Sequence, residues 1–286
     1  MADNAIEIKD LRKGYPNFSL GPINLEVPRG SMVGYIGENG AGKSTTLGII
    51  LGLIKADSGQ VKIFGEEIKD SDILNRVGVV LDDNHLPGEM KIKNVAKFCS
   101  LCFDNWEADK FEGYLKRFKL SEKQKVKTLS RGMRMKLSLS IALSHKADLM
   151  ILDEATSGLD PVVREEIIDI LMDFLQDENH TVLISSHILS DLEKGADYIA
   201  FIHEGKILFM EEKDKLLEEY GLCSLSKEAL KDINPAAIVA KRENAFGINL
   251  LVKKNLVPTW LDLKKPSIED VMIYIIKGDN NESLTL

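Results

Sequence analysis

GENGAGKST, residues 37–45, follows the apolar run MVGYI and precedes TLGIILGLI, whose apolar residues have helical spacing. A strand, a glycine-rich loop and a helix in this order are the context that a phosphate-binding loop requires. Gly37, Gly40 and Gly42 allow the backbone to curl, so that successive N–H groups and the positive end of the helix point at one anion. This stretch therefore predicts a site for a nucleotide di- or triphosphate.

The residues after these glycines carry the chemistry that such a ligand needs. Lys43 is expected to reach the β- and γ-phosphates, and Ser44 to place its hydroxyl on a Mg²⁺ ion shared with them. The alternative, a tight turn with a lone lysine, requires a chance match in the correct context. Kinases, GTPases, motors and transporter engines all use this loop, so the loop alone does not identify the reaction.

Two later apolar runs each end in polar residues. DLMILDE, residues 148–154, is typical of a buried parallel strand that delivers two carboxylates to its C-terminal edge. Asp153 is expected to hold Mg²⁺, directly or through water, and Glu154 to polarise an attacking water. TVLISSHIL, residues 181–189, repeats the design and presents His187, which can donate to a phosphate oxygen. The alternatives are an acidic turn after a strand and a surface histidine.

At this point the chain resembles the nucleotide-binding subunit of ATP-binding cassette (ABC) transporters over residues 5 to about 215. GENGAGKST is similar to the Walker A motif of that family, LMILDE to its Walker B, SGLD at 157–160 to its D-loop, and His187 to its switch histidine. Tyr15 stands where the family stacks an aromatic ring on adenine, although a tyrosine before a proline is also common in turns. The resemblance implies nucleotide contacts from Tyr15, Gly37, Asn39, Gly40, Ala41, Gly42, Lys43, Ser44, Thr45 and Asp160.

LSRGM, residues 129–133, stands where the family's signature loop normally reads LSGGQ. In the family this loop contacts the γ-phosphate bound by the opposite subunit, so that two copies enclose two nucleotides head to tail. Carried over, Ser130 supplies the hydroxyl and Gly132 the close backbone approach. Arg131 departs from the pattern: its guanidinium favours an anionic triphosphate, but its length can hold the loop away from the ligand. A basic third and a methionine fifth residue resemble a branch of cassettes that serve bacterial exporters.

A second departure lies in VGVVLDDNHL, residues 77–86, where the family usually carries glutamine at the strand end. In the family that residue touches Mg²⁺. Here the position is Asp82, so the resemblance implies a Mg²⁺ ligand, and a carboxylate is a stronger ligand than an amide. The neighbouring Asp83 leaves the register open, and an ordinary turn after a strand is the alternative.

The expected fold class is α/β. It comprises a P-loop nucleotide hydrolase core with a mixed, mainly parallel sheet, an antiparallel β subdomain, and a helical signature lobe at about 85–145, together forming an ABC ATPase domain over residues 1–215. AIEIKDLRKGY and INLEVPRG are expected to form the antiparallel strands, and YIAFIHEGKILFM a hairpin. MRMKLSLSIALS alternates and on its own predicts a strand. The family implies a helix there, which we adopt because Ser130 can cap it.

Residues 216–286 are expected to form a separate small C-terminal α+β domain. LSKEALKDI predicts a helix, IVAKRENAFGINLLVK a hairpin, and PSIEDVMIYIIKG a helix with Ile268, Val271, Met272 and Ile275 inward. The last element resembles the PSLEDVF-type ending of exporter cassettes, and simple packing of an amphipathic helix explains the same letters.

Composition excludes several classes of protein. With 44% hydrophobic and 29% charged residues the chain is typical of a soluble globular protein. No apolar run approaches the roughly 18 residues of a membrane span, and no secretory signal is visible.

The net charge of −8 argues against a nucleic-acid partner, although residues 115–136 hold nine Lys or Arg against one Glu. That segment is expected to be a solvated surface or, alternatively, an anion-attracting one.

Cys99 and Cys102 form a lone CxxC without a second pair that would complete a metal site. Their helical spacing with Phe98 and Leu101 predicts that all four pack in the core. Cys223 has the same interpretation.

Together these patterns and the family resemblance imply an ATP-binding and ATP-hydrolysing subunit that powers export through separate membrane-spanning permease subunits, with ATP and Mg²⁺ as cofactors and Glu154 and His187 as catalytic residues. A homodimer, or a pair with a related cassette, is expected, cytoplasmic and peripheral on the inner face of the cell membrane. The alternative is a soluble ABC ATPase acting on the ribosome, nucleic acid or a regulator. Such proteins usually carry two cassettes or long coiled coils, whereas this chain has one phosphate loop and no sustained heptads. A phosphotransferase would need an acceptor motif that we do not find.

Overall fold

The computed structural model describes residues 4–68, 71–82, 86–244, 247–277 and 279–280. The chain forms two compact units, Met1–Ile207 and Leu208–Leu286. The sequence analysis predicts that the second domain begins at residue 216. Within the described ranges, no helix combines the length and the apolar character that a bilayer crossing requires.

The first unit contributes most of a central sheet with the strand order β10-β9-β3-β8-β7-β6, in which β10 begins before the unit boundary at Ile207 and continues beyond it. From β6 to β9 the neighbouring strands run parallel. Every residue of β3 and of β8 is buried, as continuous apolar runs in a covered parallel sheet predict. The strands are β3 (Met32–Ile36), β6 (Val77–Val80), β7 (Leu149–Asp153), β8 (Thr181–Ser186), β9 (Tyr198–His203) and β10 (Lys206–Glu212).

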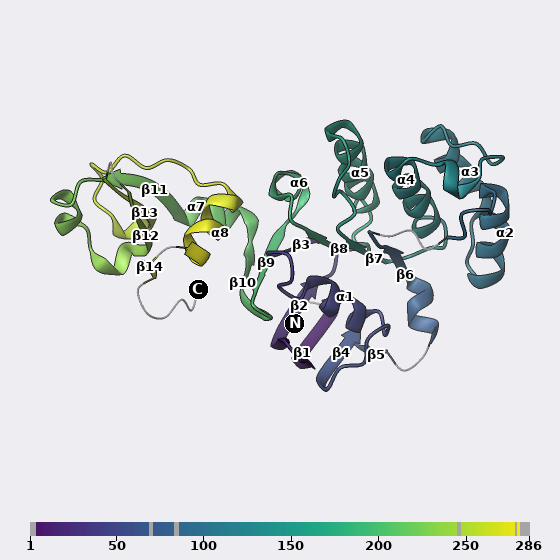
Figure 1. The fold of residues 1–286 in the computed structure, drawn as a ribbon, viewed down its shortest axis with the longest axis horizontal. Coiled ribbons are helices and arrows are strands. Elements are labelled where there is room, and N and C mark those ends of the chain that lie inside the picture. Colours follow the sequence, from purple (N-terminus) through teal and green to yellow (C-terminus); the bar gives the residue numbers. More distant parts are fainter. Residues whose placement is uncertain (1–3, 69–70, 83–85, 245–246, 278, 281–286) are drawn as a thin grey trace. The chain divides into compact units, whose positions relative to one another are not determined.

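Helices cover both faces of this sheet. Figure 1 shows α4, α5 and α6 on one side, and α1 together with the N-terminal strands on the other. Because the carboxyl ends of the parallel strands meet at one edge, the loops after β3, β7 and β8 gather there. The helices are α1 (Lys43–Ile50), α4 (Arg131–Ala142), α5 (Pro161–Phe174) and α6 (Leu189–Gly195).

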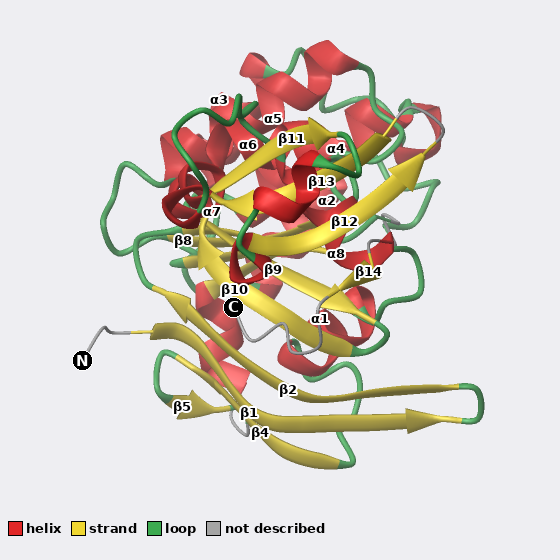
Figure 2. Ribbon diagram, turned by 90° about the vertical axis from the view of Figure 1, so that its left-hand side faces the viewer, coloured by secondary structure: helices red, strands yellow, loops and turns green. Residues whose placement is uncertain are grey.

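A second, antiparallel sheet has the order β2-β1-β4-β5 and runs along the lower part of Figure 2. Its strands are β1 (Asn4–Tyr15), β2 (Phe18–Pro28), β4 (Ser58–Ile63) and β5 (Glu66–Glu67). β1 buries the side chains of Ile6, Ile8 and Leu11. It pairs antiparallel with both β2 and β4. The expected antiparallel subdomain is therefore confirmed.

The helical lobe consists of α2 (Ile92–Cys102), α3 (Ala108–Arg117) and α4, with a short 3₁₀ turn at Val126–Thr128; a further 3₁₀ segment, Ser71–Arg76, leads into β6. The helix expected after the signature is confirmed, and the alternating pattern that suggested a strand is overridden. Ser130 is its N-cap, and its side chain accepts a hydrogen bond from the Met133 N–H at 3.2 Å. This cap favours the helix over the local pattern.

The sequence analysis predicts that four residues of α2 pack in the core: Phe98, Cys99, Leu101 and Cys102. This prediction is wrong for all of them except Cys99. Cys99 is buried, and burial raises the pKa of its thiol to about 11. Phe98 is 54% exposed, Leu101 is 79% exposed, and Cys102 is exposed as well. The inward face of α2 is instead formed by Ile92, Val95 and Cys99.

The second unit has its own sheet, with the order β11-β13-β12-β14, and its own hydrophobic core. The hairpin expected in IVAKRENAFGINLLVK is confirmed by the antiparallel pair β12 and β13; residues 245–246 at its tip lie outside the described part of the chain. The elements are α7 (Lys213–Glu219), β11 (Tyr220–Leu225), β12 (Ile238–Asn244), β13 (Gly247–Lys253), α8 (Ile268–Lys277) and β14 (Asp279–Asn280), with 3₁₀ turns at Ala229–Asp232, Pro235–Ala237 and Lys254–Leu256.

Two details of this unit correct the sequence analysis. LSKEALKDI forms only the 3₁₀ turn Ala229–Asp232, because Leu225 belongs to β11 and Asn234, the residue before Pro235, is kept out of the helical region. The closing helix α8 is confirmed. It buries Tyr274 beside Ile268, Val271 and Ile275, whereas Met272 is only partly buried.

Candidate functional site

The loop between β3 and α1 adopts a conformation that only glycine accommodates easily. Gly40 has φ +83° and Gly42, the N-cap of α1, has φ +111°. At Gly37 an added Cβ would overlap the carbonyl oxygen of Ile202 in β9. Since the left-handed region penalises other residues, the glycine spacing fixes the curled loop that precedes the helix.

Lys43 lies buried inside this loop. Its Nζ donates to the carbonyl oxygens of Gly37 at 2.7 Å and of Glu38 at 3.2 Å. The same Nζ lies 3.4 Å from Oε1 of Glu154, at the end of another strand. The structure thus places a cation at the centre of the loop and brings two sequence-predicted residues together.

Two residues that the sequence analysis did not single out support the start of α1. The Tyr35 hydroxyl lies 3.1 Å from Oγ1 of Thr46, which in turn donates to the Gly42 carbonyl at 2.9 Å. Burial raises the pKa of Tyr35, so its phenol stays neutral. These buried hydrogen bonds connect β3 to α1, the helix that begins at the loop.

Ser185 connects the ends of β7 and β8. Its Oγ donates to Oδ1 of Asp153 at 2.5 Å and accepts from the Glu154 N–H at 3.0 Å. The sequence analysis missed this role, because it depends on the parallel register that pairs Asp153 with Ser185. Asp153 is thereby oriented by a fully buried hydroxyl.

Glu154 sits between a cation and an imidazole. Its Oε2 lies 2.5 Å from Nδ1 of His187, while Oε1 is buried near Lys43 and accepts no hydrogen bond from any described residue. The backbone of Glu154 has φ +50°, a left-handed conformation that costs a non-glycine residue about 1–3 kcal/mol and is typical of functional sites. A carboxylate held with a free lone pair is suited to accept a proton from water.

Replacing Ser185 with alanine should lower the rate of ATP hydrolysis by about tenfold or more, because a residue that orients a functional carboxylate typically contributes that much. The measurement is steady-state ATPase activity together with ATP affinity, which should change little. Ser140 is a matched control, since its buried hydroxyl donates to the Lys136 carbonyl within α4, away from Asp153 and Glu154 in sequence. Unchanged turnover in a folded Ser185→Ala protein would remove Ser185 from the site.

A pocket of about 550 Å³ opens above the loop, between the first hairpin and α1. Tyr15 on its rim is exposed, with Lys13 Nζ 5.9 Å from the centre of its ring. Such a ring is available for stacking on a nucleobase. The lining residues are Tyr15, Asn17, Phe18, Asn39, Gly40, Gly42, Lys43, Ser44, Thr45 and Glu154.

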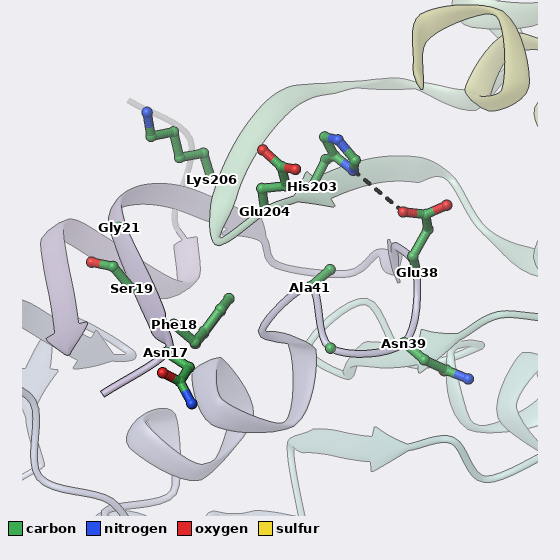
Figure 3. Close-up of a pocket in the computed structure, with 11 residues that line it drawn as sticks. Asn17, Phe18, Ser19, Gly21, Glu38, Asn39, Ala41, His203, Glu204 and Lys206 are labelled. Carbon is green, nitrogen blue, oxygen red and sulfur yellow. Dashed lines mark ion pairs between the residues drawn. The ribbon is translucent and has the colours of Figure 1, made fainter. Parts of the chain in front are cut away.

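A second hollow of about 490 Å³ shares part of this lining and is shown in Figure 3. Asn17 and Phe18 lie on one side of it, and the imidazole of His203 points toward Glu38 on the other. His203 Nδ1 is 3.6 Å from Glu38 Oε2. The turn between β9 and β10 also supports the loop directly, because Gly205 N–H donates to the Ala41 carbonyl at 3.0 Å.

The remaining candidates gather near the starts of α4 and α5. Gly132 faces α5, since an added Cβ would lie 3.5 Å from Val163. Asp160 caps α5 by accepting from the Val162 and Val163 N–H groups, both at 3.1 Å. Arg131 and Asp82, expected at the nucleotide and at the metal, form an ion pair with each other. Asp83 lies outside the described residues.

Many of the basic residues between 115 and 136 have acidic partners. Arg117 pairs with Asp173, Lys136 with Glu166, and both Lys125 and Lys127 with Glu89. These pairs favour the interpretation of the segment as a solvated, charge-balanced surface.

Comparison with known proteins agrees with this geometry. The family model described as ABC transporter matches residues 20–157. The chain is 35% identical over 208 residues to the bacitracin transport ATP-binding protein BcrA of Bacillus licheniformis, covering 71% of this chain and 68% of that protein. It is 35% identical over 212 residues to the lantibiotic transport ATP-binding protein SrtF of Streptococcus pyogenes, and this match covers 73% of this chain and 91% of that protein. A solved ATP-binding subunit of an ABC transporter matches with a TM-score of 0.68 and 26% identity, over 75% of this chain and 92% of that chain.

Proposed function

The chain belongs to the ABC transporter family as an ATP-binding subunit, and we propose that it powers export through separate membrane-spanning subunits. It binds ATP and hydrolyses it for transport. The observation that carries the assignment of the reaction is the placement of Glu154 between Lys43 and His187.

Two kinds of observation support export over import. Relatives of this chain are named for the transport of bacitracin and of a lantibiotic, and names that refer to antibiotics fit an exporter. In addition, the LSRGM signature and the PSIED ending resemble those of exporter cassettes. The membrane-spanning partner is expected to be a separate chain.

Mg²⁺ is part of this proposal. The oxygen donors at the site fit a hard cation: the Ser44 hydroxyl at the start of α1 and the Asp153 carboxylate, which Ser185 orients. When bound, Mg²⁺ supplies charge neutralisation for the β- and γ-phosphates. Lys43 holds the same phosphates, Glu154 accepts a proton from the attacking water, and His187 holds Glu154 and donates to a phosphate oxygen.

The functional assembly is proposed to be a head-to-tail pair of chains. The N-terminus of α4 presents the positive end of the helix dipole, the Ser130 hydroxyl and the partly buried Gly132, and these groups suit the γ-phosphate held by the partner's loop. Asp160 and the SGLD turn lie beside this surface. ATP binding would draw two chains together, and hydrolysis would release them.

The transport role is tested by affinity capture of the tagged chain from detergent-solubilised membranes and, separately, from the ribosomal fraction. We expect a multispanning membrane protein to be captured in stoichiometric amount, and ATPase activity to change when that complex is reconstituted into vesicles. Stable capture on ribosomes without any membrane protein would contradict transport and favour a soluble ABC ATPase.

A further inference from the structure

Arg131 and Asp82 form an ion pair with each other in this structure. Arg131 is the first residue of α4, and Asp82 follows the end of β6. Arg131 Nη2 donates to Asp82 Oδ1, and the two side chains are 44% and 53% exposed. The pair therefore lies at the surface, where a new partner can reach either group.

The guanidinium also contacts a third segment. Gly158 lies in the SGLD turn with φ +65°, and a Cβ added there would be 2.9 Å from Arg131 Nη1 and 3.1 Å from its Cζ. This turn is continuous with Glu154, whose carbonyl accepts from the Ser157 N–H at 3.0 Å. Arg131 thus joins the start of α4 to the loops that follow β6 and β7.

The charges of the pair act in opposite directions on an approaching triphosphate. A polyphosphate attracts the guanidinium of Arg131 and repels the carboxylate of Asp82. Asp82 accepts from Nη2 of Arg131, so a phosphate presented by a second chain that takes this donor replaces the carboxylate. The carboxylate therefore competes with the phosphate for the same cation.

We propose that Asp82 is a positioning residue that holds Arg131 against the SGLD turn, and that release of this ion pair accompanies ATP-driven dimerisation. The inference rests on the proposed head-to-tail dimer and specifies how its affinity is set. Exposed ion pairs are weak, so the effect of the pair on dimerisation is expected to be about two- to fivefold.

The test uses the full chain with Glu154→Gln as the parent, and measures its dimerisation with Mg²⁺ and ATP by sedimentation. Asp82→Asn should tighten dimerisation about two- to fivefold, and Arg131→Gln should weaken it. Once Arg131 has been replaced, Asp82→Asn should tighten dimerisation less, because only the direct repulsion between the carboxylate and the phosphate is then removed. Glu89→Gln is a matched control, since it removes a carboxylate from another exposed pair of the same lobe, with Lys125 and Lys127, and should leave dimerisation unchanged.

Three results would overturn the proposal. Asp82→Asn could weaken dimerisation, it could leave dimerisation unchanged, or its gain could be equally large without Arg131. Weaker Mg²⁺-dependent ATP binding by the Asp82→Asn monomer would instead identify Asp82 as a metal ligand. If the Glu154→Gln parent bound ATP without dimerising, the proposed dimer itself would fail and the ion-pair mechanism with it.

Discussion

Glu154→Gln should lower the rate of ATP hydrolysis by about 100-fold or more, because a positioned general base contributes about that factor. Glutamine has nearly the same shape and cannot accept the proton from water. ATP affinity should be preserved, since Lys43 and the glycine loop remain intact. The variant should therefore accumulate as an ATP-bound dimer. The measurements are single-turnover hydrolysis and equilibrium nucleotide binding.

The matched control for this variant is Glu165→Gln. Glu165 is an exposed glutamate of α5 that pairs with Lys194 at 3.0 Å. Its replacement should leave hydrolysis and dimerisation unchanged. Full turnover in Glu154→Gln would show that another group activates the water.

Lys43→Ala should weaken ATP binding by about 30-fold or more, which corresponds to about 2 kcal/mol. Lys43 is buried within the loop, so its loss removes a desolvated cation from the phosphate site. Titration with a fluorescent ATP analogue measures the change. A thermal unfolding curve checks that the loop and α1 remain folded.

Lys206 provides a control that separates the two hollows beside the loop. It lines the hollow of Figure 3 and is absent from the lining of the pocket that contains Lys43. Lys206→Ala should bind ATP as the unchanged protein does. Equal losses in the two variants would contradict the placement of the triphosphate in the Lys43 pocket.

The positions of Lys43, Asp153 and Glu154 were predictable because each follows a buried apolar run. Parallel strands present their carboxyl ends at one edge, so a motif after each strand is enough to bring these residues together. The helix at the signature required the family resemblance, because its local alternation suggests a strand.

The pair of Arg131 and Asp82 was not predictable from either motif. The two residues are 49 positions apart, and the conformation of two loops brings them together. The exposure of Phe98 and Leu101 was also missed, since helical spacing defines a face but does not say which face is inward. Ser185 was overlooked because its role appears only in the register between β7 and β8.

The most direct test of the account is the structure of the Glu154→Gln protein with Mg²⁺ and ATP. We predict a dimer in which the γ-phosphate bound at Lys43 of one chain lies within about 2.7–3.2 Å of the Ser130 hydroxyl or the Gly132 N–H of the other. A dimer in which each triphosphate contacts only one chain, with Ser130 and Gly132 remote from it, would contradict the account.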